Sequence, residues 1–116
     1  MNDRYGVRWT EPAVQSLEAI ADRRIQRLIL KTGETLAQEP GKKGKPLIGP
    51  LTGFRSLRVA GQRYRLIYRV NRGEVMVWIA AAGLRKEGDR RDVYELAHRL
   101  LRLGLLGPKT GRNPAD

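Results

Sequence analysis

The spacing of apolar residues changes once along this chain, and that change restricts the fold more than any other feature. Before Pro40, apolar residues recur at intervals of three and four, the spacing of one helical face. After Gly53, apolar and polar residues alternate, as in strands with one buried face. Such a chain must lay amphipathic helices on a sheet to bury both. With 116 residues, it is long enough for one core and too short for two domains.

The helical segment has two candidate N-caps. Thr10 precedes Glu11 and Pro12, an acid and a proline in the positions that favour a helix start. Asp22 is either a second cap or a break between two helices. The apolar positions at helical spacing are Val14, Leu17, Ile20, Ala21, Ile25, Leu28, Ile29, Thr32 and Leu36. The pattern predicts a helical hairpin that ends before Pro40.

Alternation predicts three strands, at Phe54–Val59, Arg63–Val70 and Val75–Ala82, joined by glycine-bearing hairpin turns. A short strand at Tyr5–Trp9 precedes the hairpin, and a further helix follows Asp92. We therefore predict an α+β fold: an N-terminal strand and helical hairpin, three antiparallel strands with helices on one face, and a C-terminal helix. Residues 1–104 form one domain, and residues 105–116 form a disordered C-terminal tail.

The charge is concentrated in one part of the chain. There are 23 Lys and Arg residues against 12 Asp and Glu, a net charge of +11. From Pro40 to Gly73 there is no acid, and the basic residues are Lys42, Lys43, Lys45, Arg55, Arg58, Arg63, Arg65, Arg69 and Arg72. An arginine-rich composition alone would not exclude acids from so long a run. The segment predicts a nucleic-acid partner first and an acidic protein second.

Several classes of function are excluded or disfavoured. Without cysteine, the chain has no disulfide, thiolate zinc site or thiol nucleophile. It contains no apolar stretch near the roughly 18 residues of a membrane span and no signal-peptide core at its N-terminus. We expect a cytoplasmic protein with no membrane association. The acidic residues lack the spacing of a carboxylate pair or metal site, so we expect no metal and no cofactor.

Strand parity predicts a cationic face on the sheet. If Leu66 and Tyr68 face the helices, the opposite face carries Arg63, Arg65, Ile67 and Arg69. In the preceding strand, the same parity places Ser56 and Arg58 on this open face. Arg55 has the wrong parity for the open face unless a bulge intervenes. Like charges across a sheet repel, so an anionic ligand would stabilise this face. The alternative is that the cations protect strand edges from aggregation.

These segments carry a family resemblance. The ordered set Gly-Phe-Arg-Ser-Leu-Arg-Val, Arg-Tyr-Arg-Leu-Ile-Tyr, Gly-Leu-Arg and Asp-Val-Tyr resembles the signature of RelE-like toxins of the RelE/ParE superfamily, over roughly Val7 to Leu103. The resemblance implies the toxin of a type II toxin–antitoxin system, a ribosome-dependent and metal-independent endoribonuclease that cuts mRNA in the A site and inhibits translation. By position it implies catalytic roles for Arg58, Arg65, Arg85 and Tyr94. This chain differs in lacking lysine on the first of those strands and in having extra residues between Arg85 and Tyr94.

Attack of a ribose 2′-OH on the neighbouring phosphate needs a base, charge neutralisation and an acid. Arg58 and Arg65 can neutralise the phosphate, since guanidinium matches its oxygens. Arg85 would stabilise the leaving oxygen or donate a proton to it. Without a strand lysine, Tyr94 is the better candidate base, and the resemblance implies a 2′,3′-cyclic phosphate product. Other residues that could act as the base are Glu87, Asp89, Glu95 and His98.

The remaining cations are expected to bind RNA without reacting: Arg55, Arg63, Arg69, and Lys42, Lys43 and Lys45 on a flexible loop. The expected partners are mRNA, the ribosome with its 16S rRNA, and an acidic antitoxin. The free toxin would be a monomer and the antitoxin complex a hetero-oligomer. One alternative is a ParE-like DNA gyrase inhibitor, although such proteins generally lack the Arg and Tyr found at 85 and 94. Another is a non-catalytic RNA-binding module, which would need aromatic residues on the open face.

Overall fold

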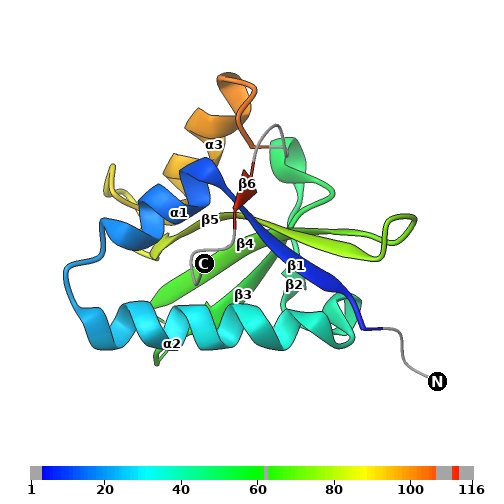
Figure 1. Ribbon diagram of the computed structural model, residues 1–116. Helices are drawn as coiled ribbons and strands as arrows, with labels where there is room; N and C mark the ends of the chain where they lie inside the picture. The colour runs from blue at the N-terminus through cyan, green and yellow to red at the C-terminus, as the bar shows by residue number, and fades with distance from the viewer. Residues whose placement is uncertain (1–3, 62, 107–110, 113–116) are drawn as a thin grey trace.

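The computed structural model describes residues 4–61, 63–106 and 111–112. Within them, one sheet has the strand order β2-β3-β4-β5-β1-β6 (Figure 1). Its strands are β1 Gly6–Thr10, β2 Lys45–Pro46, β3 Arg55–Val59, β4 Tyr64–Asn71, β5 Met76–Leu84 and β6 Gly111–Arg112. The α-helices are α1 Glu11–Glu18, α2 Arg23–Glu34 and α3 Val93–Arg102, and the 3-10 turns are Thr35–Ala37, Pro40–Lys42 and Gly49–Leu51. The predicted α+β fold is confirmed.

The three central strands pair in chain order, β3 with β4 and β4 with β5, both antiparallel as predicted. The first strand does not continue the antiparallel meander. Instead, β1 lies next to β5 and pairs with it in parallel. A parallel pair needs a long crossover, and the helical hairpin is part of that connection. Two short strands extend the sheet: β2 pairs with β3, and β6 pairs with β1. Neither was predicted, since two residues are too few to show alternation.

Both predicted N-caps are present. The Thr10 hydroxyl accepts the N–H of Ala13 at 3.2 Å, which starts α1 one residue after the strand ends. The Asp22 carboxylate accepts the N–H of Arg24 at 2.9 Å and starts α2. The two caps start the two helices, which lie against the sheet (Figure 1), and the buried residues of both helices pack in one core with those of the sheet.

A first core lies between the helical hairpin and the sheet. It includes Trp9, Val14, Leu17, Ile29, Leu36, Leu66, Tyr68, Val77 and Ile79. Gly33 favours this close contact, because a Cβ there would stand 3.0 Å from Cζ2 of Trp9 and would push the indole outward. Leu28 was wrongly assigned to the buried stripe: it is 47% exposed, because the neighbouring Ile29 takes the position that faces the core.

A second core lies on the opposite face of the sheet, so the helices do not all share one face. Helix α3 and the Gly49–Leu51 turn bury Leu51, Phe54, Ile67, Ala80, Ala81, Val93, Ala97, Leu100 and Leu106 there. A β-bulge contributes to this core. Ile67 pairs with Ala81, whereas Tyr68 pairs with Ile79, so Ala80 is an extra residue in β5. The bulge places two consecutive alanines against α3. The predicted open face is therefore covered at its centre.

The predicted disordered tail differs from the structure where the structure describes it. Leu106 is 3% exposed and belongs to the second core. Gly111 and Arg112 pair with Thr10 and Trp9 as β6. The rest of the tail, residues 107–110 and 113–116, lies outside the described residues. Among the helices of the described residues, none has the length and apolar character needed to cross a bilayer.

The basic loop between α2 and β3 was predicted to be flexible, but buried groups anchor it. The hydroxyl of the fully buried Tyr68 lies 2.9 Å from the carbonyl oxygen of Pro40 and 2.6 Å from that of Lys43. Arg55 adds two bonds, from Nε to the carbonyl of Lys43 at 2.9 Å and from Nη2 to that of Gly44 at 3.2 Å. Burial raises the pKa of the Tyr68 phenol, although Arg55 acts in the opposite direction.

Tyr68→Phe should lower the free energy of unfolding by about 1 kcal/mol, because a buried carbonyl and a part-buried one lose the phenolic donor they share. The raised pKa adds a pH dependence: the contribution of Tyr68 is complete below about pH 10 and is lost as the pH rises further. Urea unfolding at neutral and alkaline pH measures both effects. Tyr64→Phe, on the same strand and face, is the control and should change little. Equal stability of the two variants would contradict the anchoring role.

Candidate nucleic-acid interface

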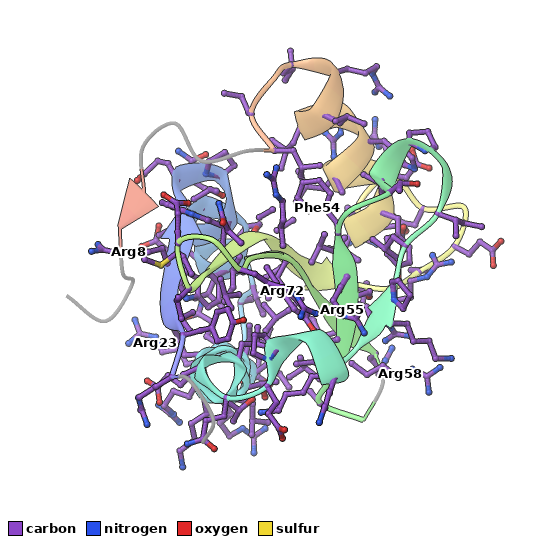
Figure 2. All side chains as sticks on the ribbon, turned by 90° about the vertical axis from the view of Figure 1, so that its right-hand side faces the viewer. Arg8, Arg23, Phe54, Arg55, Arg58 and Arg72 are labelled. Atoms are coloured by element: carbon purple, nitrogen blue, oxygen red, sulfur yellow. The ribbon has the colours of Figure 1, made fainter. Side chains whose placement is uncertain are left out.

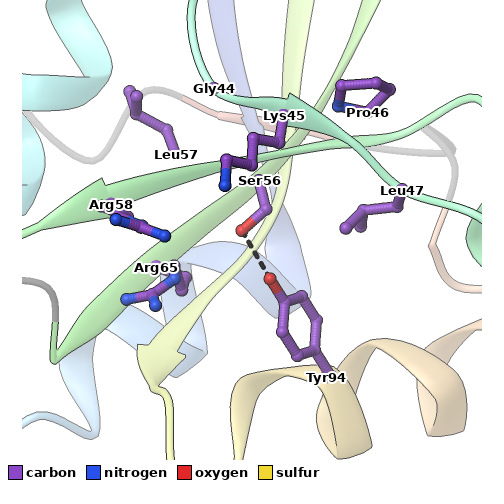
Figure 3. Close-up of a pocket in the computed structure, with 9 residues that line it drawn as sticks. All are labelled: Gly44, Lys45, Pro46, Leu47, Ser56, Leu57, Arg58, Arg65 and Tyr94. Carbon is purple, nitrogen blue, oxygen red and sulfur yellow. Dashed lines mark hydrogen bonds between the residues drawn. The ribbon is translucent and has the colours of Figure 1, made fainter.

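A pocket of about 420 Å³ opens on the α3 side of the sheet, between β2, β3, β4 and α3 (Figure 3). Its lining residues are Gly44, Lys45, Pro46, Leu47, Ser56, Leu57, Arg58, Arg65 and Tyr94. Three of them are cationic, none is acidic, and two carry hydroxyl groups. This composition suits a phosphate ester whose oxygens need positive charge and whose reacting hydroxyl needs a proton acceptor.

Strand pairing brings two of the predicted cations together. Arg58 and Arg65 are directly opposite in the β3–β4 ladder, and both side chains line the pocket (Figure 3). One nitrogen of Arg65 also donates to the carbonyl oxygen of Tyr64 at 3.2 Å, which orients its guanidinium. Like charges directly opposite each other destabilise a sheet by roughly 0.2–1 kcal/mol. An anion bound between them would offset this cost.

Lys45 supplies a third cation to the pocket, although the sequence predicts that it lies on a flexible loop. It lies opposite Ser56 in the β2–β3 pair, and that pairing brings its side chain to the pocket. The other two loop lysines behave differently: Lys43 donates to the carbonyl oxygen of Thr35, and Lys42 pairs with a glutamate on the same turn. The signal that could have separated Lys45 is its place beside Pro46, a residue typical of short edge strands.

Tyr94 reaches the pocket from the first turn of α3. Its hydroxyl donates a hydrogen bond to Oγ of Ser56 at 2.8 Å (Figure 3). Ser56 is only 6% exposed, so this contact lies at the inner wall of the pocket. Parity predicted that Ser56 faces outward, but nothing in the sequence gave it a role. The pair joins α3 to β3 and fixes where the phenol sits relative to Arg58 and Arg65.

Arg85 contacts Tyr94 and does not line the pocket. Its Cζ lies 4.6 Å from the centroid of the Tyr94 ring, a cation–π contact. Its Nη1 donates to Asp92 at 2.8 Å, and this hydrogen bond raises the pKa of Arg85. The Asp92 carboxylate, 3% exposed, also accepts the N–H of Tyr94 at 3.0 Å and that of Lys86 at 2.6 Å. Asp92 is therefore both the N-cap of α3 and the anchor of Arg85, a double role that the sequence did not reveal.

The remaining predicted cations are not gathered in the pocket. Arg55 turns toward the loop carbonyls, as its parity requires. Arg63 is exposed in the turn before β4, and Arg69 is exposed on β4 beyond the buried Ile67. In Figure 2, Arg58 lies at the right of the view, and Arg8, on β1, lies at the left. The cationic surface therefore extends well beyond the pocket.

The residues that the sequence offers as alternative bases do not line the pocket. They are Glu87, Asp89, Glu95 and His98. Asp89 bonds to Arg91, and these hydrogen bonds hold the pKa of its carboxyl well below the usual range. Glu87 lies 3.9 Å from Arg85 and is highly exposed. The extra residues before Tyr94 thus form an ion-paired turn outside the pocket. Across the described part of the chain, no group of three His, Asp or Glu side chains could hold a metal ion.

Comparison with known proteins identifies the family of this chain. The family model described as the ParE toxin of the parDE type II toxin–antitoxin system matches residues 7–88. A crystal structure of the RelBE2 toxin–antitoxin complex from Mycobacterium tuberculosis is similar at 34% identity, with a TM-score of 0.64, and the match covers 71% of this chain and 92% of the other.

Two structures of the Escherichia coli toxin RelE share the fold at lower identity. The free form of a double mutant is 19% identical with a TM-score of 0.65, and the match covers 83% of this chain and 96% of the mutant. The isolated toxin is 21% identical with a TM-score of 0.56, and the match covers 82% of this chain and 96% of that toxin. A comparison with curated protein sequences finds no match. On the family model and the M. tuberculosis relative together, this chain belongs to the RelE/ParE superfamily of toxins from type II toxin–antitoxin systems.

Proposed function

We propose that this toxin is a ribosome-dependent endoribonuclease that cuts mRNA in the A site without using a metal. The observation that carries the proposal is a pocket whose lining combines Arg58, Arg65 and Lys45 with Tyr94, whose hydroxyl is hydrogen-bonded to Ser56. A cyclising phosphate needs charge neutralisation from several directions, and three cations can take the part that a metal takes in other nucleases.

In the proposed reaction, the ribose 2′-oxygen bonds to phosphorus and the bond from phosphorus to the 5′-oxygen breaks. The two guanidiniums, Arg58 and Arg65, stabilise the charge that builds on the phosphoryl oxygens. Tyr94 accepts the proton of the 2′-hydroxyl as its own proton passes to Oγ of Ser56, whose hydroxyl proton leaves to solvent. Lys45 is a protonated donor within the pocket for the departing 5′-oxygen. The products are a 2′,3′-cyclic phosphate and a 5′-hydroxyl.

Arg85 has a different place in this proposal from the one that the family resemblance implied. It is a positioning residue, since its guanidinium is held by Asp92 and packs on the Tyr94 ring. Through that contact it fixes the plane of the ring, and hence the direction of the phenolic oxygen. Loss of Arg85 would then reduce the rate by displacing Tyr94, with no direct contact to the phosphate.

Inhibition of DNA gyrase is the second candidate, because the matching family model is that of a ParE toxin. One pair of assays separates the two functions. Primer extension on a translated messenger after induction should show cuts confined to translated codons, and purified gyrase should keep its supercoiling activity in the presence of the toxin. Inhibited supercoiling with an intact messenger would replace the proposed function by the second candidate.

Tyr94→Phe should reduce the single-turnover rate of cleavage on ribosome-bound mRNA by about 10²–10⁴-fold, because it removes only the hydroxyl that handles the proton. Ser56→Ala should reduce it by about 10²-fold, because the phenol loses the partner that fixes its position. Ribosome affinity should be retained in both variants. Tyr64→Phe, a tyrosine of the first core, is the control. Cleavage by Tyr94→Phe at the unaltered rate would remove Tyr94 from the mechanism.

The loop lysines should separate into two classes. Lys45→Gln should lower the cleavage rate at saturating ribosome by about 10²-fold, because it removes a cation from the pocket. Lys42→Gln should leave that rate unchanged and at most weaken binding at low salt, with a slope change of about 0.7 log units per lost phosphate contact. Rates and affinities measured over a salt series distinguish these effects. Equal saturated rates for the two variants would place Lys45 outside the chemistry.

The M. tuberculosis relative was crystallised as a toxin–antitoxin complex, and we propose an acidic, partly disordered antitoxin for this chain too. A net charge of +11 favours such a partner. Co-expression with the neighbouring gene should yield a heteromeric complex that loosens as salt screens the charges. Isolation of the toxin as a free monomer from the intact operon would count against this proposal.

A further inference from the structure

Three side chains form a row across the sheet, away from the pocket. Trp78 on β5 has Arg8 of β1 as its partner on one side and Arg69 of β4 on the other. Neighbouring strands lie about 4.8 Å apart, so the three side chains stand next to one another. Val77 and Ile79 belong to the first core, which turns Trp78 to the opposite face, the same face as the pocket.

This row is accessible, whereas the next row of the same face is not. Arg8 and Arg69 are exposed and Trp78 is partly exposed. One step further along the strands, Thr10, Ala80 and Ile67 are buried, and Ala80 and Ile67 belong to the second core with α3. Within the described residues, neither Arg8 nor Arg69 makes a salt bridge. An indole with a guanidinium on each side is thus left facing solvent at the edge of the second core.

The row is separate from the pocket. Arg65 and Arg69 are four residues apart on β4, which corresponds to about 13 Å along a strand. Ile67 lies between them under the second core, so the two cationic regions are not continuous along the strand. The separation of Arg8 from Arg58 is also visible in Figure 2, where they lie at opposite sides of the view.

We propose that Arg8, Trp78 and Arg69 form a second binding site for single-stranded RNA. One base stacks on the indole, and the phosphates before and after it bind the two arginines. Trp78 supplies the aromatic residue on the open face that binding to single-stranded RNA needs. An acidic peptide would use the arginines but leave the indole without a stacking partner, so RNA fits the row better. The site needs no cleavage, and the inference therefore goes beyond the proposed function.

The test uses a 2′-O-methyl oligonucleotide, which cannot be cut by 2′-hydroxyl attack. Because Trp9 is 3% exposed, quenching of indole fluorescence reports mainly on Trp78. The unaltered toxin should bind with quenching. Arg8→Gln combined with Arg69→Gln should weaken binding about tenfold at low salt and reduce the salt slope by about 0.7 log units per lost contact. Trp78→Leu should weaken binding about tenfold or more.

Three controls make the result specific. Arg23→Gln combined with Arg27→Gln removes the same charge from exposed positions on α2 and should retain both quenching and salt slope. Arg58→Gln combined with Arg65→Gln disables the pocket and should retain quenching, so failure of the proposed nuclease would not be mistaken for failure of this site. An abasic oligonucleotide should bind weakly and without quenching, a comparison that does not depend on the folding of a Trp78 variant.

The proposal would be overturned by any of three results. Absence of quenching with the base-bearing oligonucleotide would show that no base stacks on Trp78. Equal affinity and quenching with the abasic oligonucleotide would reduce the row to a charged surface. Poly-glutamate that binds more tightly than the oligonucleotide, and with the same dependence on Trp78, would identify a protein partner instead.

Discussion

Burial of both faces of β4 is the constraint on which the rest of the structure depends. Leu66, Ile67 and Tyr68 are consecutive and fully buried, so side chains that point in opposite directions both need a covering layer. The helical hairpin covers one side, and α3 with its neighbouring turn covers the other. The charged residues of β4 consequently lie toward the two ends of the strand. Arg65 lines the pocket, and Arg69 belongs to the row with Trp78 and Arg8.

Local features of this fold could be predicted from the sequence, and contacts between distant segments could not. The caps at Thr10 and Asp22 and the three central strands follow from neighbouring residues alone. The parallel pairing of β1 with β5 and the side of the sheet that α3 covers depend on contacts with distant segments. No local sequence pattern predicts such contacts. The same division holds in the site. The alternation of residues in the strands predicted that Arg58 and Arg65 share one face. The roles of Lys45, Ser56 and Asp92 could not be predicted, because they depend on partners elsewhere in the chain.

Tyr94 is held at both ends by hydrogen bonds, and the turn that precedes it takes no part in them. Asp92 holds the backbone N–H of Tyr94, and Ser56 holds the hydroxyl. The additional residues before the helix form a turn in which Asp89 pairs with Lys86 and Arg91. Because the turn closes on itself through these ion pairs, it stands apart from the contacts that hold Tyr94.

The order of the pocket residues along the chain also sets the order in which the pocket can be assembled. A chain leaves the ribosome N-terminus first, so Lys45, Ser56, Arg58 and Arg65 emerge before Tyr94. Until α3 is synthesised and docks on the bulged alanines of β5, the cations of the pocket have no phenol beside them. The pocket is therefore completed last, and a nascent chain lacks the aromatic wall of its own pocket until α3 has been made.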